Sequence, residues 1–155
     1  YDFLIFDTGA GISTNVTYFC SAAHEILLVA TTEPTSLTDV YALIKTLHTK
    51  HAQKYFRVII NLVGSEAEAQ LIFKNLTAVA DSYLPDVSVE YLGYILSDPV
   101  VTKAVRQQKA FSELYPHSKV TQCINRLVQK MVGEKKSVVD EEQSTLFWRT
   151  AFTVQ

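Results

Sequence analysis

Cysteine is scarce in this chain. Only Cys20 and Cys123 occur among its 155 residues, and both lie in apolar stretches. Small domains that depend on disulfides carry a denser set of cysteines, so we expect two buried free thiols here. Long apolar runs are missing as well, because no stretch approaches the ~20 residues that span a bilayer, and no signal peptide is visible. These absences favour a cytoplasmic globular protein.

Neither sign of charge dominates. The chain has 14 Lys and Arg residues against 16 Asp and Glu residues, a formal net charge of −2. No general attraction to nucleic acid or to an anionic membrane follows from this balance, and we predict no direct nucleic-acid binding. The composition, 48% hydrophobic and 19% charged, is typical of a folded domain. The length is sufficient for one domain with a substantial core.

Strand and helix signals alternate along the sequence. Strand-like apolar runs cover residues 3–7, 26–31, 57–63 and 87–95. Helical periodicity covers the segments between them and a later segment around 120–131. A shorter helix is expected after Asp98, which can cap it, with Pro99 in its first position. This βαβα order predicts an α/β fold, a mainly parallel sheet with helices on both faces.

The most informative segment is the opening run of residues 2–11, Asp-Phe-Leu-Ile-Phe-Asp-Thr-Gly-Ala-Gly. A buried parallel strand would deliver Asp7 to the carboxyl edge of the sheet, where ligands bind. Gly9 and Gly11 would let the backbone approach a phosphate closely, so the segment suits a Mg²⁺–phosphate site. The structural alternative is an aspartate that caps the next helix. Because only Tyr1 precedes this run, we interpret the chain as the later part of a larger nucleotide-binding domain.

The residues that follow the other strands would lie at the same edge. Asn61 comes late in an apolar strand, and its carboxamide can pair with an adenine edge through one donor and one acceptor. A buried asparagine that fastens a loop is the alternative. Asp98 and Pro99 follow the last strand.

Four segments together resemble the MinD/ParA class of deviant P-loop ATPases, and within it the flagellar branch called FlhG, FleN or YlxH. Residues 7–12, Asp-Thr-Gly-Ala-Gly-Ile, resemble the Walker B and switch II segment of the class. Residues 31–45 resemble the flagellar branch, as do residues 92–95 with 98–99, and residues 105–109 with 114–118. The resemblance runs from residue 1 to about 132.

The resemblance implies a role for each candidate residue. Asp7 would hold Mg²⁺ through water, and Gly9 to Gly11 would form the switch that senses the γ-phosphate of ATP. Asn61 would read adenine, while Asp98 and Pro99 would border the base. The family forms an ATP-sandwiched homodimer, with the turn at residues 33–39 near the dimer face. An ATP-dependent switch of flagellar number or placement is thus implied, with an FlhF-like GTPase, a C-ring component or a flagellar transcription activator as partner.

One departure from the family is large. The Gly-rich loop with the phosphate-binding lysines and the switch I aspartate are absent from this sequence. Phosphoryl transfer depends on positioning and charge stabilisation, so we predict that this chain alone does not hydrolyse ATP.

Three alternative functions stay open: a MinD or ParA protein of division or partition, a catalytically silent binding module of the same fold, and an unrelated doubly wound domain.

Two sets of basic side chains carry weaker signals. The histidines that invite a metal hypothesis are His24, His48, His51 and His117. His48 and His51 are three residues apart on a predicted helix, but no cysteine or carboxylate cluster accompanies them, and we expect no histidine metal site. Lys103, Arg106 and Lys109 share a helical face, which a solvated surface explains better than phosphate or partner binding.

We divide the chain into residues 1–132, part of a MinD-like ATPase domain, and residues 133–155, a polar linker with a final helix over about 141–152. The apolar set in this tail is Leu146, Phe147, Trp148, Ala151 and Phe152. A helix that lies on a membrane surface usually carries Lys and Arg on its polar face. Here Arg149 is the only base of the predicted helix and acidic residues 140–142 lie at its start. Membrane contact through residues 140–155 and docking on a protein surface therefore both stay open.

Overall fold

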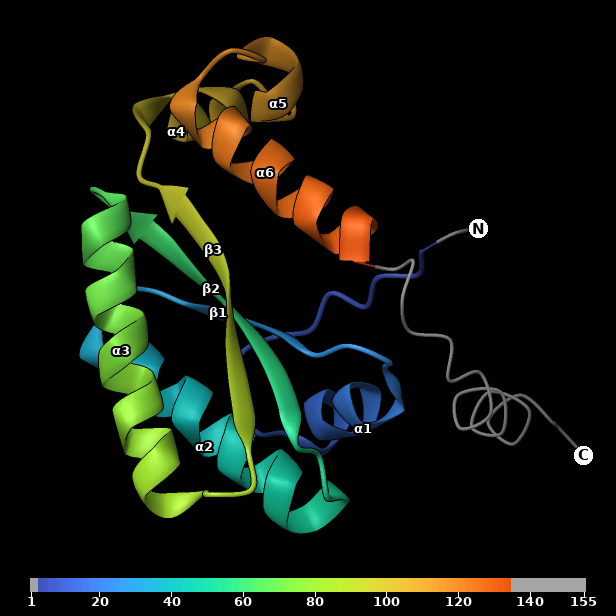
Figure 1. Ribbon diagram of the computed structural model, residues 1–155. Coiled ribbons are helices and arrows are strands. Elements are labelled where there is room, and N and C mark those ends of the chain that lie inside the picture. Colours follow the sequence, from blue (N-terminus) through green and yellow to red (C-terminus); the bar gives the residue numbers. More distant parts are fainter. Residues whose placement is uncertain (1–2, 135–155) are drawn as a thin grey trace, which may run out of the picture.

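The computed structural model describes residues 3–134 (Figure 1). Its elements follow in the order α1 (Thr14–Ala22), β1 (Leu27–Ala30), α2 (Pro34–His51), β2 (Tyr55–Val63), α3 (Glu66–Tyr83), β3 (Ser88–Leu96), α4 (Pro99–Arg106), α5 (Phe111–Leu114) and α6 (Lys119–Glu134). The strands form one sheet in the order β1-β2-β3, and both strand pairs are parallel. The α/β prediction is confirmed.

Helices cover both faces of this sheet (Figure 1). On one face, alternate residues of β2, Phe56, Val58 and Ile60, pack with apolar residues of α2 and α3. On the other face, Ile59 packs with Leu92 of β3 and Leu127 of α6. The central strand is thus buried on both sides, as is usual for a parallel sheet, because the crossover helices lie on its faces.

The helices begin where the sequence offers a cap. Ser65 Oγ accepts a hydrogen bond from the backbone N–H of Glu68 at 3.2 Å, and Asp98 Oδ1 accepts one from Val100 at 3.0 Å. Such side chains satisfy N–H groups that have no partner inside the helix. Pro99 follows Asp98 as the first residue of α4, as predicted.

A bulge in β3 brings α6 close to the sheet. Tyr91 pairs with Val58 and Gly93 pairs with Ile59, so Leu92 is an extra residue between them. Gly93 has φ +157°, and a Cβ atom there would lie 2.8 Å from Leu127 Cδ2. A side chain at this position would press against the Leu127 side chain of α6.

The predicted strand over residues 3–7 is wrong. Within the part of the chain that the structure describes, this segment has no strand pairing, and Leu4 and Ile5 are 72% and 82% exposed. A strand needs a neighbour for its backbone groups, and among the described strands β1 pairs with β2 alone. The segment therefore runs as extended coil before α1 (Figure 1).

Two helices, α1 and α5, were not predicted from the sequence, and α6 continues to Glu134, past the expected start of the linker at residue 133. The rest of the predicted linker and the predicted final helix lie outside the described residues. No helix within residues 3–134 is long and apolar enough to cross a membrane.

Candidate functional site at the carboxyl edge of the sheet

Three loops meet where the parallel strands end. Ala30 at the end of β1 pairs with Ile60 of β2, and Val63 at the end of β2 pairs with Leu96 of β3. The backbone N–H of Ser97 also donates to the carbonyl of Val63 at 2.9 Å. The residues after β1, the end of β2 and the start of α4 are therefore neighbours, which is the usual position of a ligand in an open parallel sheet.

Asn61 lies at an irregular point of this edge. Its Oδ1 accepts a hydrogen bond from the backbone N–H of Leu62 at 2.9 Å. Leu62 has φ +60° and is 56% exposed. A leucine in the left-handed region is uncommon and costs free energy, and such residues cluster at functional sites. The Asn61 carboxamide retains two N–H donors and a second lone pair on its oxygen.

Asp98 and Pro99 lie at the first turn of α4, next to the end of β3. The carboxylate of Asp98 caps the helix, so part of its acceptor capacity is already used. Pro99 is exposed at the first helical position. The structure thus gives Asp98 a structural role, and the expected role of both residues beside an adenine stays a prediction.

Asp7 lies in a different setting from the one predicted. It lines a hollow of about 330 Å³ with residues 8–10, with Ser13, which caps α1, and with three residues of α1, namely Asn15, Val16 and Phe19. Gly11 has φ +97°, which favours glycine, and a Cβ at Gly9 or Gly11 would meet no atom within 4 Å. The backbone of this segment is therefore open to a ligand, but no strand holds the Asp7 carboxylate at the sheet edge.

The donor set around Asp7 limits the kind of cation it suits. Within residues 3–134, no group of three or more His, Cys, Asp or Glu side chains is placed to hold a metal ion. Mg²⁺ is often bound through one or two carboxylates, retains several waters and takes its other ligands from phosphate groups. A lone, exposed Asp7 fits such a water-rich ion bound with a nucleotide.

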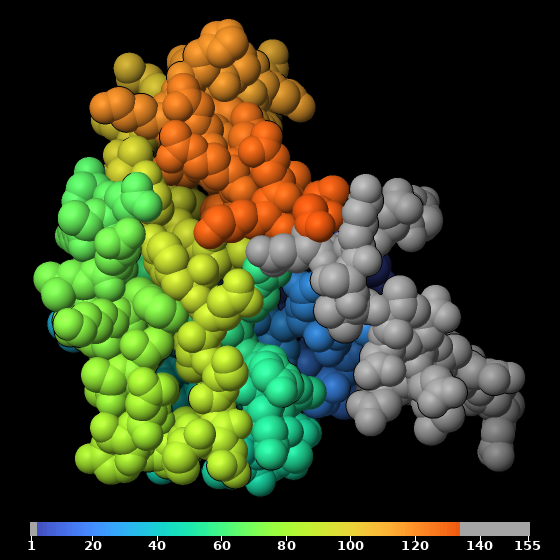
Figure 2. All heavy atoms as spheres, viewed as in Figure 1, coloured from blue at the N-terminus to red at the C-terminus, as the bar shows by residue number. Residues whose placement is uncertain are grey.

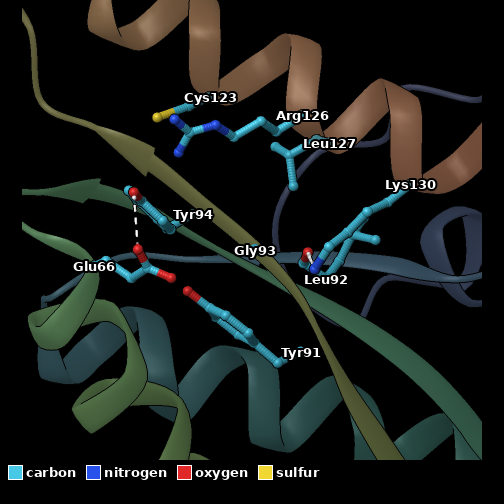
Figure 3. Close-up of a pocket in the computed structure, with 9 residues that line it drawn as sticks. All are labelled: Glu66, Tyr91, Leu92, Gly93, Tyr94, Cys123, Arg126, Leu127 and Lys130. Atoms are coloured by element: carbon cyan, nitrogen blue, oxygen red, sulfur yellow. Dashed lines mark hydrogen bonds between the residues drawn. The ribbon is translucent and has the colours of Figure 1, made fainter.

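Sequence reasoning missed two features. One is the left-handed Leu62, for which the sequence carries no signal. The other is a small pocket beside β3, lined in part by Tyr91, Tyr94 and Arg126 (Figure 3). Its signal was Gly93, because a glycine inside a strand often marks a bulge or a close approach of another element.

Comparison with known proteins places the chain in a family. The antiactivator FleN of Pseudomonas aeruginosa is 45% identical over 130 residues, which cover 84% of this chain and 46% of that protein. The flagellum site-determining protein YlxH of Helicobacter pylori is 29% identical over 133 residues, 86% of this chain and 45% of that protein. The chain thus spans a little under half the length of these relatives, and no protein-family profile matches it. From the identity to FleN over most of the chain, together with the parallel α/β sheet, we conclude that this protein belongs to the FlhG/FleN family.

Proposed function

We propose that this chain is part of a flagellar regulator, and that the full-length protein acts as an ATP-dependent dimerisation switch controlling flagellar number or placement. The observation that carries the proposal is the 45% identity to an antiactivator, FleN, over 84% of the chain. The similarity to a flagellum site-determining protein also supports a role in flagellar regulation.

The sheet edge supports a nucleotide as the switching ligand. Asn61 would pair with the base, with Asp98 and Pro99 beside it, and Asp7 would hold Mg²⁺ through water. Bound ATP would supply the γ-phosphate whose presence distinguishes the two states of the switch. In the ATP state, two copies would associate, and the turn at residues 33–39 would lie near their interface. An FlhF-like GTPase, a C-ring component or a flagellar transcription activator would then read the state.

Two exposed surfaces indicate where the rest of the full-length protein would pack. Leu27 and Val29 on β1 are 38% and 51% exposed, and the strand-like residues 3–6 are exposed as well. A parallel strand between β1 and residues 3–7 would satisfy the backbone of both. We propose that the remaining half of the full-length protein supplies this strand together with the phosphate-binding loop, and so brings Asp7 to the nucleotide.

The test is ATP binding by the full-length protein with and without Mg²⁺. Asp7→Ala should weaken Mg²⁺-dependent binding by about tenfold, equivalent to about 1.4 kcal/mol, and leave Mg²⁺-free binding unchanged. Asp86→Ala, in the exposed turn before β3, is the matched control. Unchanged Mg²⁺-dependent affinity and turnover in Asp7→Ala would refute the assignment of this carboxylate.

Two further measurements bear on the switch. The 155-residue chain alone should show no ATP turnover, and measurable turnover would contradict that expectation. Sedimentation of the full-length protein should show a dimer with ATP and Mg²⁺ and a monomer with ADP. Full-length protein that binds no ATP would favour a silent binding module.

A further inference from the structure

The end of β2 is irregular where the strand reaches the proposed nucleotide site. Two residues of β2, Asn61 and Leu62, lie there opposite a single residue of β3, Ile95. This arrangement is a β-bulge, which often redirects side chains next to functional sites. The segments that follow the two strands, green before α3 and yellow before α4, lie side by side at the molecular surface (Figure 2).

Leu62 has a backbone conformation that leucine rarely adopts. Its φ is +60°, in the left-handed region, where the Cβ atom crowds the following carbonyl oxygen. Its side chain is 56% exposed, so packing within the described residues does little to offset the cost. In this conformation the backbone N–H of Leu62 donates a hydrogen bond to Oδ1 of the preceding Asn61, at 2.9 Å.

This hydrogen bond fixes the orientation of the Asn61 carboxamide. Of the two ends of a carboxamide, only the oxygen accepts a hydrogen bond. A carboxamide rotated by half a turn would place its NH₂ group against the Leu62 N–H, and the bond would be lost. In the observed orientation, Oδ1 retains a second lone pair and the NH₂ group retains both of its hydrogens. The side chain therefore offers one acceptor and one donor in a fixed order.

We propose that Leu62 is a positioning residue, whose backbone N–H holds the Asn61 carboxamide in the orientation that selects adenine over a purine with an oxygen at position 6. The inference rests on the proposed nucleotide site. Adenine carries a 6-amino donor beside a ring nitrogen that accepts, which suits the free lone pair of Oδ1 and the NH₂ group. Guanine and hypoxanthine carry an oxygen in place of the amino group, so Oδ1 would face a second acceptor. Only a carboxamide free to rotate can present its NH₂ group to that oxygen.

The test compares the binding of ATP and of inosine triphosphate, which has an oxygen in place of the 6-amino group, to the full-length protein. Leu62→Gly tolerates the positive φ and should retain the preference for ATP within about twofold. Leu62→Val disfavours the positive φ because valine is β-branched, and it should reduce the preference by about fivefold through loss of one hydrogen bond. A preference lost in Leu62→Gly and retained in Leu62→Val would overturn the proposal, because the side chain and not the backbone would then carry the selectivity.

The ratio of the two affinities separates positioning from stability. A variant that only folds less well weakens the binding of both nucleotides alike and leaves the ratio unchanged. Leu71→Val, at a position of α3 that is 60% exposed, is the matched control and should also leave the ratio unchanged. Tight ATP binding without a preference over inosine triphosphate would refute this inference alone. A full-length protein that binds neither nucleotide would refute the proposed function, and this inference with it.

A second measurement needs no nucleotide. Hydrogen exchange of the Leu62 N–H in the full-length protein, corrected for intrinsic rates, should be slower by about threefold or more than in Asn61→Ala, which removes the acceptor. Asn61→Asp keeps an acceptor and removes the donors, so it should retain the slow exchange while binding ATP more weakly. Equally fast exchange in the parent protein and in Asn61→Ala would show that the carboxamide is not held, and the proposal would be wrong.

Discussion

Tyr91 combines a well-packed ring with an unsatisfied hydroxyl. The ring lies 5.1 Å from the ring of Phe73, measured between centroids, while its Oη has no hydrogen-bond partner within the described part of the chain. Tyr91→Phe keeps the ring and removes the hydroxyl, so the free energy of unfolding should rise by about 1 kcal/mol. Urea denaturation measures this free energy. Tyr94→Phe is the control, because it removes a hydroxyl that does have an acceptor; a larger stability gain in that variant would contradict the explanation.

The same hydroxyl makes stability depend on alkaline pH. The pKa of Tyr91 is raised from 10.0 to about 12 in the folded protein, chiefly by burial. Between these values the unfolded chain loses the proton and the folded chain retains it, so stability falls as pH rises. The contribution is fully present below pH 10 and is lost as the pH passes through about 12. Urea denaturation from about pH 8 to about pH 11.5 should show a widening stability gap in favour of Tyr91→Phe; a constant gap would be inconsistent with the raised pKa.

The contact between β3 and α6 depends on Gly93. A Cβ there would lie 2.8 Å from Leu127 Cδ2, and the backbone φ of +157° adds strain for any other residue. We expect Gly93→Ala to lower the free energy of unfolding by about 1–3 kcal/mol, because the buried Leu127 side chain must leave its place and the backbone is strained. Thermal or urea denaturation gives the value.

Gly133→Ala is the matched control, since a Cβ at Gly133 meets no atom within 4 Å and the residue lies within α6. Alanine favours helix over glycine by up to about 1 kcal/mol, so this variant should be neutral or more stable. Equal destabilisation by the two substitutions would show that the approach of Leu127 is not the cause.

The strands and helices that the sequence pattern predicted correctly are those that pack against other elements of the described chain. The apolar run of β2 forms a strand because β1 and β3 flank it, and Asp98 with Pro99 starts α4 by capping chemistry that is local in sequence. Residues 3–7 carry the same apolar pattern, but pattern alone does not specify a neighbour. Helix α1 was missed because its residues Thr14–Ala22 include β-branched and aromatic side chains with modest helix propensity.

The residues of the candidate site also divide into those that the sequence could place and those that it could not. The sequence placed Asn61 late in β2 and Asp98 with Pro99 after β3, and the structure confirms both strands, so the position of these residues near the carboxyl edge was predictable from parallel topology. The setting of Asp7 was not, because it depends on a strand that lacks a partner within residues 3–134. The bulge at Leu92 and the pocket beside it were not predictable either, since they arise from how α6 packs on β3.

The exposed apolar segment at residues 3–6 affects how whole molecules associate with one another. Phe3, Leu4, Ile5 and Phe6 are 41%, 72%, 82% and 36% exposed, and Val29 is 51% exposed on β1, which has one paired edge among residues 3–134. Contiguous apolar surface and an unpaired strand edge both favour association. The 155-residue chain should therefore self-associate with rising concentration, and the double change Leu4→Glu with Ile5→Lys should reduce this in sedimentation experiments.

The same double change should have the opposite consequence in the full-length protein. If the remaining half supplies a strand between β1 and residues 3–7, Leu4 and Ile5 become buried there, and two charges without partners would destabilise the protein by more than about 3 kcal/mol. Val105→Lys is the control, because Val105 is 68% exposed on α4 and should be neutral in both proteins. Urea denaturation of the 155-residue chain and of the full-length protein, each with and without the substitutions, measures these changes in stability. A double variant that leaves the full-length protein as stable as the parent would mean that residues 3–7 stay outside the sheet, and that Asp7 is held at the nucleotide in some other way or not at all.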